Sequence, residues 1–386
     1  MEYSERIKSL PPYIFAEIDK KKKAAIQAGR PIINLGIGDP DRPTPKKIVD
    51  YAKKALEKPE NHPYPIGSGS GVFKESIIKW MYRRFNAAVS MEEVLVLIGA
   101  KDGITHLPFA YVNKGDIVLI PDPAYPGYRS ATLLAEGEPY FMPLTAENNF
   151  LPDLEAVPEE VYKKAKIMFL NYPNNPISAT ADKGFYEKAV EKAKKYDFLI
   201  AQDNAYSEIY FDEENKPLSI LEIQGAKDCA IEFYSMSKTY NMTGWRVAFV
   251  VGNAKAVKGL LTVKENIDSG TFTALQEVSA FALEKCDEES RAIRELYKKR
   301  AQIFYKGLTE LGYKVLEPNA TLYLWCEVPK SYDSMDFVSK VLDEADMVIT
   351  PGIGFGKMAD KYFRIALTVE EKTIAEALER FKKLKL

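Results

Sequence analysis

Short apolar runs alternate along the chain with longer amphipathic stretches. Within each run the apolar residues are consecutive, as expected for strands that are buried on both faces of a sheet. The runs cover residues 93–98, 116–120, 166–170, 198–201, 230–234 and 246–251. Most of them end in a cluster of Gly, Pro, Asn, Asp or Ser, after which a helical pattern begins. This alternation predicts an α/β fold with a large, mostly parallel central sheet flanked by helices.

The pattern changes from about Arg291 onward. A charged amphipathic helix is predicted to about Leu311, then strands over 322–325 and 362–367, and a final helix over about 369–383. We interpret residues 286–386 as a smaller α+β domain, against which residues 1–45 pack, and residues 46–285 as the large domain. A chain of 386 residues is long enough for two such domains.

The polar clusters share one position, just past the carboxyl end of a predicted strand. Open α/β sheets bind their ligands outside these strand ends, so the clusters are expected to converge on one site. The most informative cluster contains Ser235, Ser237, Lys238 and Arg246. A neutral lysine held against a carbonyl carbon forms a Schiff base, and hydroxyls beside an arginine suit a phosphate. A carbonyl and a phosphate on one small molecule indicate pyridoxal phosphate, although a solvated lysine in a loop is the plainer interpretation.

The other strand ends offer what this cofactor needs around its ring. An anion must face the pyridine nitrogen, and Asp203 is placed for that, unless it only caps a turn. Asn175 and Tyr206 suit the phenolic oxygen. Tyr125 offers a flat face on which the ring can stack, or is one more packed aromatic among 23 tyrosines.

The remaining candidates concern the phosphate, the proton and the substrate. Ala100 and Lys101 open the helix after the first predicted strand, where backbone amides bind phosphate. Lys238 would serve a second time, as the acid/base that moves a proton between Cα and the cofactor carbon. Arg364, in a strand of the smaller domain, would bind an α-carboxylate through two bonds; a surface ion pair is the alternative.

Composition narrows the function classes. A net charge of −2 gives no reason to expect nucleic acid or an anionic membrane as a partner. Two distant histidines and three scattered cysteines argue against a metal site, and reduced cysteines suggest a cytoplasmic protein. The run from Gly36 to Pro40 lacks the third glycine of a dinucleotide fingerprint, so we interpret it as a tight loop whose backbone approaches the substrate.

Taken in order, these residues resemble the class I/II aminotransferases of pyridoxal-phosphate fold type I, over nearly the whole chain. The positions that carry the resemblance are Tyr64, Ala100, Lys101, Tyr125, Asn175, Asp203, Tyr206, Ser235, Ser237, Lys238, Arg246 and Arg364. The resemblance implies a Schiff-base lysine at Lys238 and a homodimer with shared active sites. In that dimer the position of Tyr64 reaches the phosphate of the partner's cofactor.

Several stretches are more closely similar to the bacterial L,L-diaminopimelate aminotransferases. They are residues 10–16, 35–41, 171–176 and 237–246. Those enzymes transfer an amino group between glutamate/2-oxoglutarate and tetrahydrodipicolinate in lysine biosynthesis. The similarity implies substrate contacts for Tyr13, Gly38, Lys101, Tyr125, Asn175 and Arg364.

Alternatives stay open on the same fold. The chain departs from the expected pattern at Gly67–Gly71, which is rich in glycine and serine, and at Ile353, where a polar residue is expected. Both departures concern the distal part of the pocket. An aminotransferase for aspartate, alanine or an aromatic amino acid is therefore an alternative, as is a β-lyase or synthase. A non-catalytic binding protein is the alternative from another class.

Overall fold

The computed structural model describes residues 1–11 and 16–384 and has the predicted α/β architecture. Its largest sheet has seven strands in the order β2-β8-β7-β6-β5-β3-β4. The strands are β2 (Val94–Leu97), β3 (Ile117–Asp122), β4 (Glu138–Pro143), β5 (Ala165–Leu170), β6 (Leu199–Asp203), β7 (Ala230–Ser235) and β8 (Ala248–Gly252). Only β8 runs in the direction opposite to the other six strands. The prediction of a mostly parallel sheet is therefore confirmed.

One strand of this sheet escaped the sequence analysis. Strand β4 lies at the edge of the sheet and pairs with β3 alone. Only Met142 of its six residues is buried, so it lacks the continuous apolar run that marks the central strands. Its two prolines also suit an edge position, because a proline has no amide to donate to a further strand.

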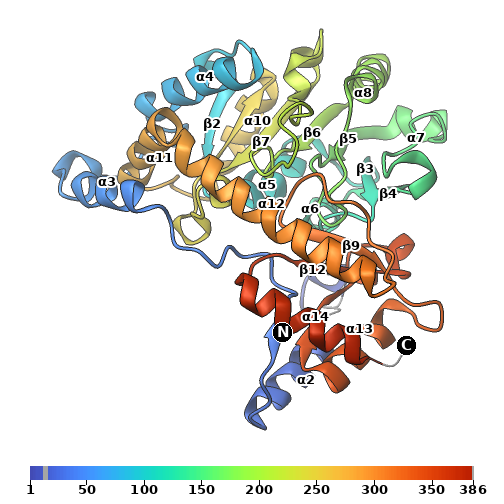
Figure 1. Ribbon diagram of the computed structural model, residues 1–386. Coiled ribbons are helices and arrows are strands. Elements are labelled where there is room, and N and C mark those ends of the chain that lie inside the picture. The colour runs from blue at the N-terminus through green and yellow to red at the C-terminus, as the bar shows by residue number, and fades with distance from the viewer. Residues whose placement is uncertain (12–15, 385–386) are drawn as a thin grey trace.

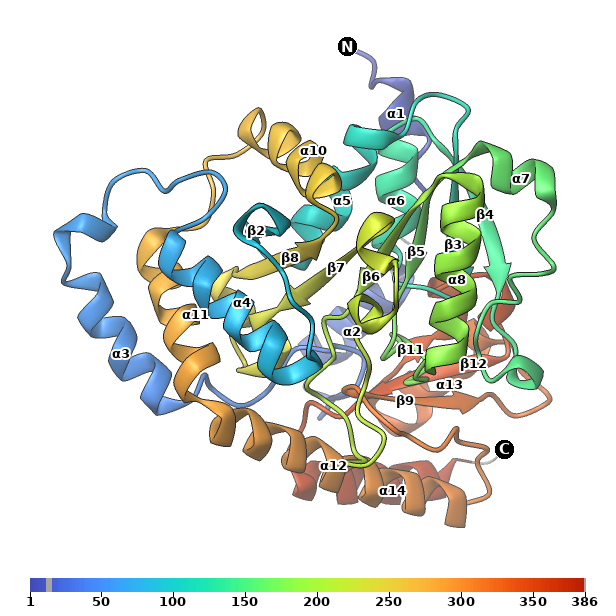
Figure 2. The ribbon, with the colours of Figure 1, turned by 90° about the horizontal axis from the view of Figure 1, so that it is seen from above.

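Helices cover both faces of the large sheet (Figure 2). One layer packs α5 (Ala100–Tyr111) between α6 (Gly127–Leu134) and α10 (Ala254–Glu265). The opposite layer contains α3 (Lys46–Leu56), α4 (Gly71–Phe85), α7 (Glu159–Lys164), α8 (Lys183–Tyr196) and α11 (Thr273–Lys285). The central strands are buried on both sides, which is why their sequences are apolar in consecutive positions.

A second group of elements lies beyond the long helix α12 (Asp287–Glu310), as Figure 1 shows. It contains the antiparallel sheet β11-β12-β9 and a parallel pair, β1 with β10. The strands are β1 (Ile33–Asn34), β9 (Tyr323–Glu327), β10 (Met347–Val348), β11 (Thr350–Pro351) and β12 (Tyr362–Ala366). The helices are α2 (Ala16–Gln27), α13 (Ser334–Ala345) and α14 (Glu371–Lys383). Helix α12 begins four residues before the predicted start at Arg291, because its first turn is acidic rather than apolar and suits the helix dipole.

The N-terminal segment packs with this second group. Ile33 and Leu35 belong to the same apolar core as Phe304 of α12. Arg300, fully buried on α12, donates to both carboxylate oxygens of Asp41 at 2.6 and 2.9 Å. The short helix α1 (Glu5–Lys8) instead lies near α6. The domain boundaries at 45/46 and 285/286 stay a prediction. In the described ranges no helix has both the length and the apolar character needed to cross a membrane.

Candidate active site

A cavity of about 600 Å³ opens at the carboxyl ends of β3, β5, β6 and β7. It brings together nearly all of the residues that the sequence predicts. They are Gly38, Ala100, Lys101, Tyr125, Asn175, Asp203, Tyr206, Ser235, Ser237, Lys238, Arg246 and Arg364. Tyr64 is not among the lining residues, and Tyr13 lies outside the described residues. The clusters at the end of the large sheet, from Ala100 to Arg246, thus meet at one sheet edge although they lie up to 146 residues apart in the chain. Gly38 and Arg364 reach the same cavity from outside this sheet.

Lys238 lies in the single turn of α9 (Met236–Thr239), directly after β7. Its Nζ donates to the backbone oxygen of Gly38 at 2.7 Å. Removal of the amine from water lowers the pKa of Lys238, and Arg364 and Arg246 act in the same direction, against Tyr323 and Asp39. A lowered pKa makes the neutral amine, which is the nucleophile and the base, more available.

Asp203, the last residue of β6, presents a buried carboxylate to the cavity. Its oxygens accept from the Tyr128 hydroxyl at 2.7 Å and from the Ala205 amide at 3.2 Å. Burial raises the pKa of Asp203 to about 6, although both hydrogen bonds act against that rise. Among the described residues no cation pairs with Asp203. A cationic ring nitrogen beside it would supply the missing charge.

The part of the cavity at the start of α5 is built for an anion. Helix α5 begins there after Gly99, and no side chain caps its first amides. Gly99 has a φ of 89°, and a Cβ at this position would lie 2.1 Å from Nη2 of Arg246. The guanidinium can lie against the start of the helix only because residue 99 is glycine. Ser235 and Ser237 line the same cavity, so amides, hydroxyls and a cation converge there.

Arg364 on β12 brings a buried guanidinium into the cavity from the second group of elements. Nη1 donates to Oδ1 of Asn175 at 2.8 Å, and Nη2 donates to the oxygen of Gly36 at 2.9 Å. Its Nε is buried without a partner in the described part of the chain. The guanidinium also lies over the Tyr323 ring, 4.0 Å from the ring centre. These contacts hold the Arg364 guanidinium in place, and it still has N–H groups that can donate to a carboxylate.

Tyr323 on β9 is a site residue that the sequence analysis missed. Its hydroxyl lies 2.9 Å from the hydroxyl of Tyr206. A Cβ at position 38 would lie 2.0 Å from the same hydroxyl, so this close approach requires Gly38. Its strand was predicted, but among 23 tyrosines no local signal marks this one.

Tyr125 and Tyr206 complete the aromatic part of the cavity. Burial raises the pKa of Tyr125 to about 12, and the charge of Asp203 adds to that rise. Burial likewise raises the pKa of Tyr206, with a further contribution from Tyr323. Both hydroxyls therefore stay protonated near neutral pH and can donate hydrogen bonds to an anionic oxygen.

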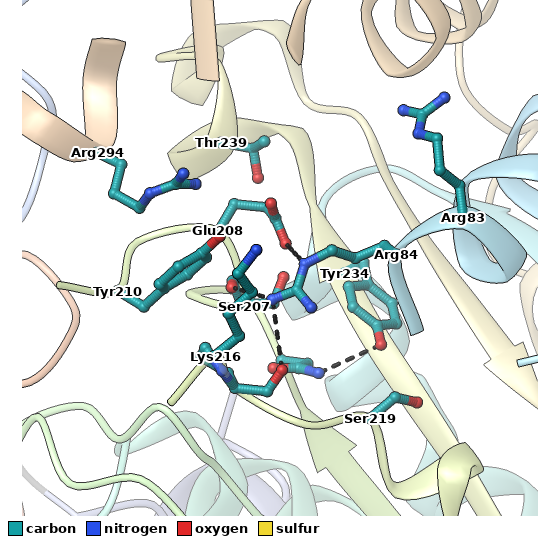
Figure 3. A network of polar contacts seen from close by, with 12 residues as sticks. Arg83, Arg84, Ser207, Glu208, Tyr210, Lys216, Ser219, Tyr234, Thr239 and Arg294 are labelled. Atoms are coloured by element: carbon teal, nitrogen blue, oxygen red, sulfur yellow. Dashed lines mark hydrogen bonds and ion pairs between the residues drawn. The ribbon is translucent and has the colours of Figure 1, made fainter. Parts of the chain in front are cut away.

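A buried polar network holds the segment that follows Asp203 (Figure 3). Arg84 of α4 donates to Oε1 of Glu208 at 2.9 Å, and Arg294 of α12 lies over the ring of Tyr210. Figure 3 shows the two arginines on opposite sides of Glu208. Burial raises the pKa of Glu208, whereas both arginines act to lower it. The network ties α4 and α12 to the chain that carries Tyr206.

Two places where the sequence departs from the expected pattern are absent from this cavity wall. Neither Gly67–Gly71 nor Ile353 is among the lining residues of the described chain. Gly67 faces Glu265, and the amide of Ile353 donates to the Ser334 hydroxyl at 3.3 Å. Helix α2 contributes instead. Ile18, Asp19 and Lys22 line the cavity, and the polar sequence of α2 gave no sign of it.

The comparisons with known proteins bear on the whole chain. The profile of the family "Aminotransferase class I and II" matches residues 30–381. The chain belongs to the class I and II aminotransferases. It is 53% identical to the LL-diaminopimelate aminotransferase of Aquifex aeolicus, over the full length of both chains. Among solved structures, BacF from Bacillus subtilis superposes with a TM-score of 0.95 at 38% identity, covering 100% of this chain and 99% of the other. An aspartate aminotransferase from Thermotoga maritima superposes with a TM-score of 0.92 at 29% identity, covering 98% and 99%.

Class I and II aminotransferases use pyridoxal phosphate, and the cavity fits this group. It offers an amine whose pKa is lowered, a buried carboxylate without a cationic partner, and an uncapped helix start beside an arginine. These are the three features that a carbonyl, a protonated ring nitrogen and a phosphate require. The predicted family, fold and cofactor are therefore confirmed.

Proposed function

We propose that this aminotransferase transfers an amino group between L,L-diaminopimelate and 2-oxoglutarate, as in lysine biosynthesis. The observation that carries the proposal is the 53% identity to an LL-diaminopimelate aminotransferase over the full length of both chains. The aspartate aminotransferase of similar fold is only 29% identical, although it superposes almost as well. Fold likeness alone does not choose a substrate, because one fold serves many reactions.

We assign the cofactor roles as follows. When bound, pyridoxal phosphate supplies a carbonyl carbon for the amine and an electron sink for the charge released at Cα. Lys238 binds the carbonyl carbon, and Asp203 keeps the ring nitrogen protonated. Asn175 and Tyr206 donate to the phenolic oxygen, and Tyr125 stacks on the ring. The phosphate is bound by Ala100, Lys101, Ser235, Ser237 and Arg246.

With the cofactor bound, Lys238 would also act as the acid/base of the reaction. Its neutral amine would move a proton between the substrate Cα and the cofactor carbon. The direction of the pKa shift of Lys238 supports this role, since a lowered pKa makes the unprotonated base more available. Arg364 orients the substrate by binding its α-carboxylate, and Asn175, bonded to Arg364, keeps the guanidinium in place.

We further propose a homodimer in which Tyr64 serves the partner's site. The Tyr64 side chain is 90% exposed and lies outside the cavity of its own chain. Ile66, Val72 and Ile267 are also exposed, and Gly270 lies against Pro65, so the exposed apolar residues come from neighbouring segments. An exposed apolar region of this kind supports a protein interface. Light scattering at micromolar concentration tests the dimer, and a monomeric, fully active enzyme would refute it.

The substrate is tested by the amino-donor profile of the purified protein with 2-oxoglutarate. We expect kcat/KM for L,L-diaminopimelate to exceed that for aspartate, alanine and phenylalanine by at least about tenfold, because unpaired polar groups in the pocket penalise the wrong substrate. Higher activity with aspartate would refute the choice of substrate. Release of pyruvate and ammonia from a β-substituted amino acid, with no keto acid added, would indicate a β-lyase instead.

A further inference from the structure

The wall of the active-site cavity that α2 forms carries a pair of opposite charges. The Nζ of Lys22 lies 2.9 Å from Oδ1 of Asp19, one turn earlier on the same helix. The Lys22 side chain is 20% exposed and that of Asp19 is 36% exposed. Both residues line the cavity that also contains Lys238 and Arg364.

Neighbouring contacts fix which side of α2 faces the cavity. Lys21 pairs with Asp343 of α13 at 3.3 Å and also reaches Ser339. Arg30, just beyond the helix, binds the carboxylate of Asp346. These contacts attach α2 and its C-terminal end to the second group of elements, and they leave Lys22 on the cavity side.

We propose that Lys22 and Asp19 bind the distal amino-acid head of the substrate. This inference rests on the proposed function and adds to it the residues that select the substrate. Diaminopimelate carries an ammonium and a carboxylate at the end remote from the reacting carbon. Lys22 donates to that carboxylate, and Asp19 accepts from that ammonium. Arg364 holds the α-carboxylate at the reacting end, so the substrate lies between Arg364 and α2.

The chemistry of the pair favours this substrate over the alternatives. An ion pair that is partly in water is weak, so it opens at little cost when a ligand offers both complementary charges. A phenyl or methyl side chain would remove the pair from water without giving it a partner, which is unfavourable. Glutamate carries a single distal carboxylate, two carbons closer to Cα than that of diaminopimelate. It therefore makes at most part of this contact.

The test compares two half-reactions of the same cofactor-loaded protein, one with L,L-diaminopimelate and one with L-glutamate. We expect Lys22→Met to lower kcat/KM for diaminopimelate by about 10- to 100-fold, the loss typical of a hydrogen bond between charged groups. The loss with glutamate should be at least about tenfold smaller. Asp19→Asn should also act selectively on diaminopimelate, and Lys22→Arg should restore most of the activity because it keeps the charge.

Lys21→Met is the matched control, since it removes a lysine from the same helix on the side that faces α13. It should leave the ratio of the two activities unchanged. An equal loss with both substrates in Lys22→Met would mean that the residue only supports α2, and the inference would be wrong while the proposed function stands. A wild-type protein that turns over glutamate but not diaminopimelate would overturn both.

Discussion

Lys264 contacts helix α5, Lys238 lines the cavity at which α5 begins, and the surroundings of the two lysines differ in charge. Lys264 on α10 is only 1% exposed, and its amine contacts the carboxylates of Asp102 and Asp268. Lys238 faces the cavity, bonds to a backbone oxygen, and has Arg246 and Arg364 nearby. The more deeply buried lysine thus has two anionic partners, whereas no carboxylate among the described residues pairs with Lys238.

Burial alone therefore does not prepare a lysine for chemistry. The Lys264 ammonium has two carboxylate partners, and Asp102 in turn contacts both Lys264 and His106. Burial would raise the pKa of Asp102, but His106 and Lys264 lower it overall. Asp102 also accepts from the amide of Ile98 at 2.8 Å, so this cluster holds the chain that leads into α5. Lys264 therefore has a structural role, and Lys238 has the chemical one.

Replacement of Lys238 should have the largest effect on activity. Lys238→Ala should lower transamination by roughly 10⁴-fold or more, because both the nucleophile and the proton carrier are lost. It should still bind the cofactor through the phosphate-binding residues and Asp203. The measurement is single-turnover kinetics together with cofactor retention. In the wild type, borohydride should attach the cofactor to the peptide that contains Lys238, and attachment at Lys264 would reverse the comparison.

Replacement of Lys264 should have the largest effect on stability. Lys264→Met takes the ammonium away from Asp102, whose side chain is 8% exposed, and from Asp268, which should cost about 3–5 kcal/mol in the free energy of unfolding. Urea unfolding of the cofactor-free protein measures it. Lys46→Met, which removes an exposed lysine paired with Asp50, is the control and should change stability little. If Lys264→Met left the free energy of unfolding unchanged, the structural role assigned to Lys264 would be wrong.

Replacement of Gly99, just before α5, should have an intermediate effect, in this case on the affinity for the cofactor. Gly99→Ala places a Cβ against the guanidinium of Arg246 at a φ of 89°. We expect the cofactor dissociation constant to rise by roughly 10- to 100-fold, from about 1–3 kcal/mol of strain and displacement. Equilibrium dialysis with pyridoxal phosphate measures it. Gly115→Ala, a glycine with a φ of 87° and open space around its Cβ position, is the control for the backbone effect alone.

The smallest effect concerns Asp203, a second buried charge without a counter-ion. Its pKa is raised from 3.8 to about 6, so the folded state holds a proton that the unfolded state has lost. The resulting stability is fully present below about pH 4 and is lost as the pH rises through 6. Between pH 7 and pH 5 the cofactor-free wild type should therefore gain about 1 kcal/mol relative to Asp203→Asn. Paired urea titrations at the two pH values test this, and a difference that does not depend on pH would mean that Asp203 already has a cationic partner.

The two lysines also show how far local sequence carries a prediction. Lys238 was identifiable because its cluster of serines and arginine lies within a few residues of it, directly after an apolar strand. Asp203 and Asn175 followed from the same rule, because the ends of parallel strands share one sheet edge. Lys264 carries no such signal, since Asp102 belongs to α5 and Asp268, four residues later, forms only an ordinary i,i+4 pair.

The α/β class, the strands buried on both faces and the residues at the strand ends could all be predicted from the chain's local pattern. Periodicity and strand-end position are local properties, and local properties are readable in one chain. The tertiary structure alone decided that Tyr323 contacts Tyr206, that Arg246 lies against Gly99, and that α2 presents Asp19 and Lys22 to the cavity. Those contacts join segments far apart in the chain, and packing, rather than local pattern, selects them.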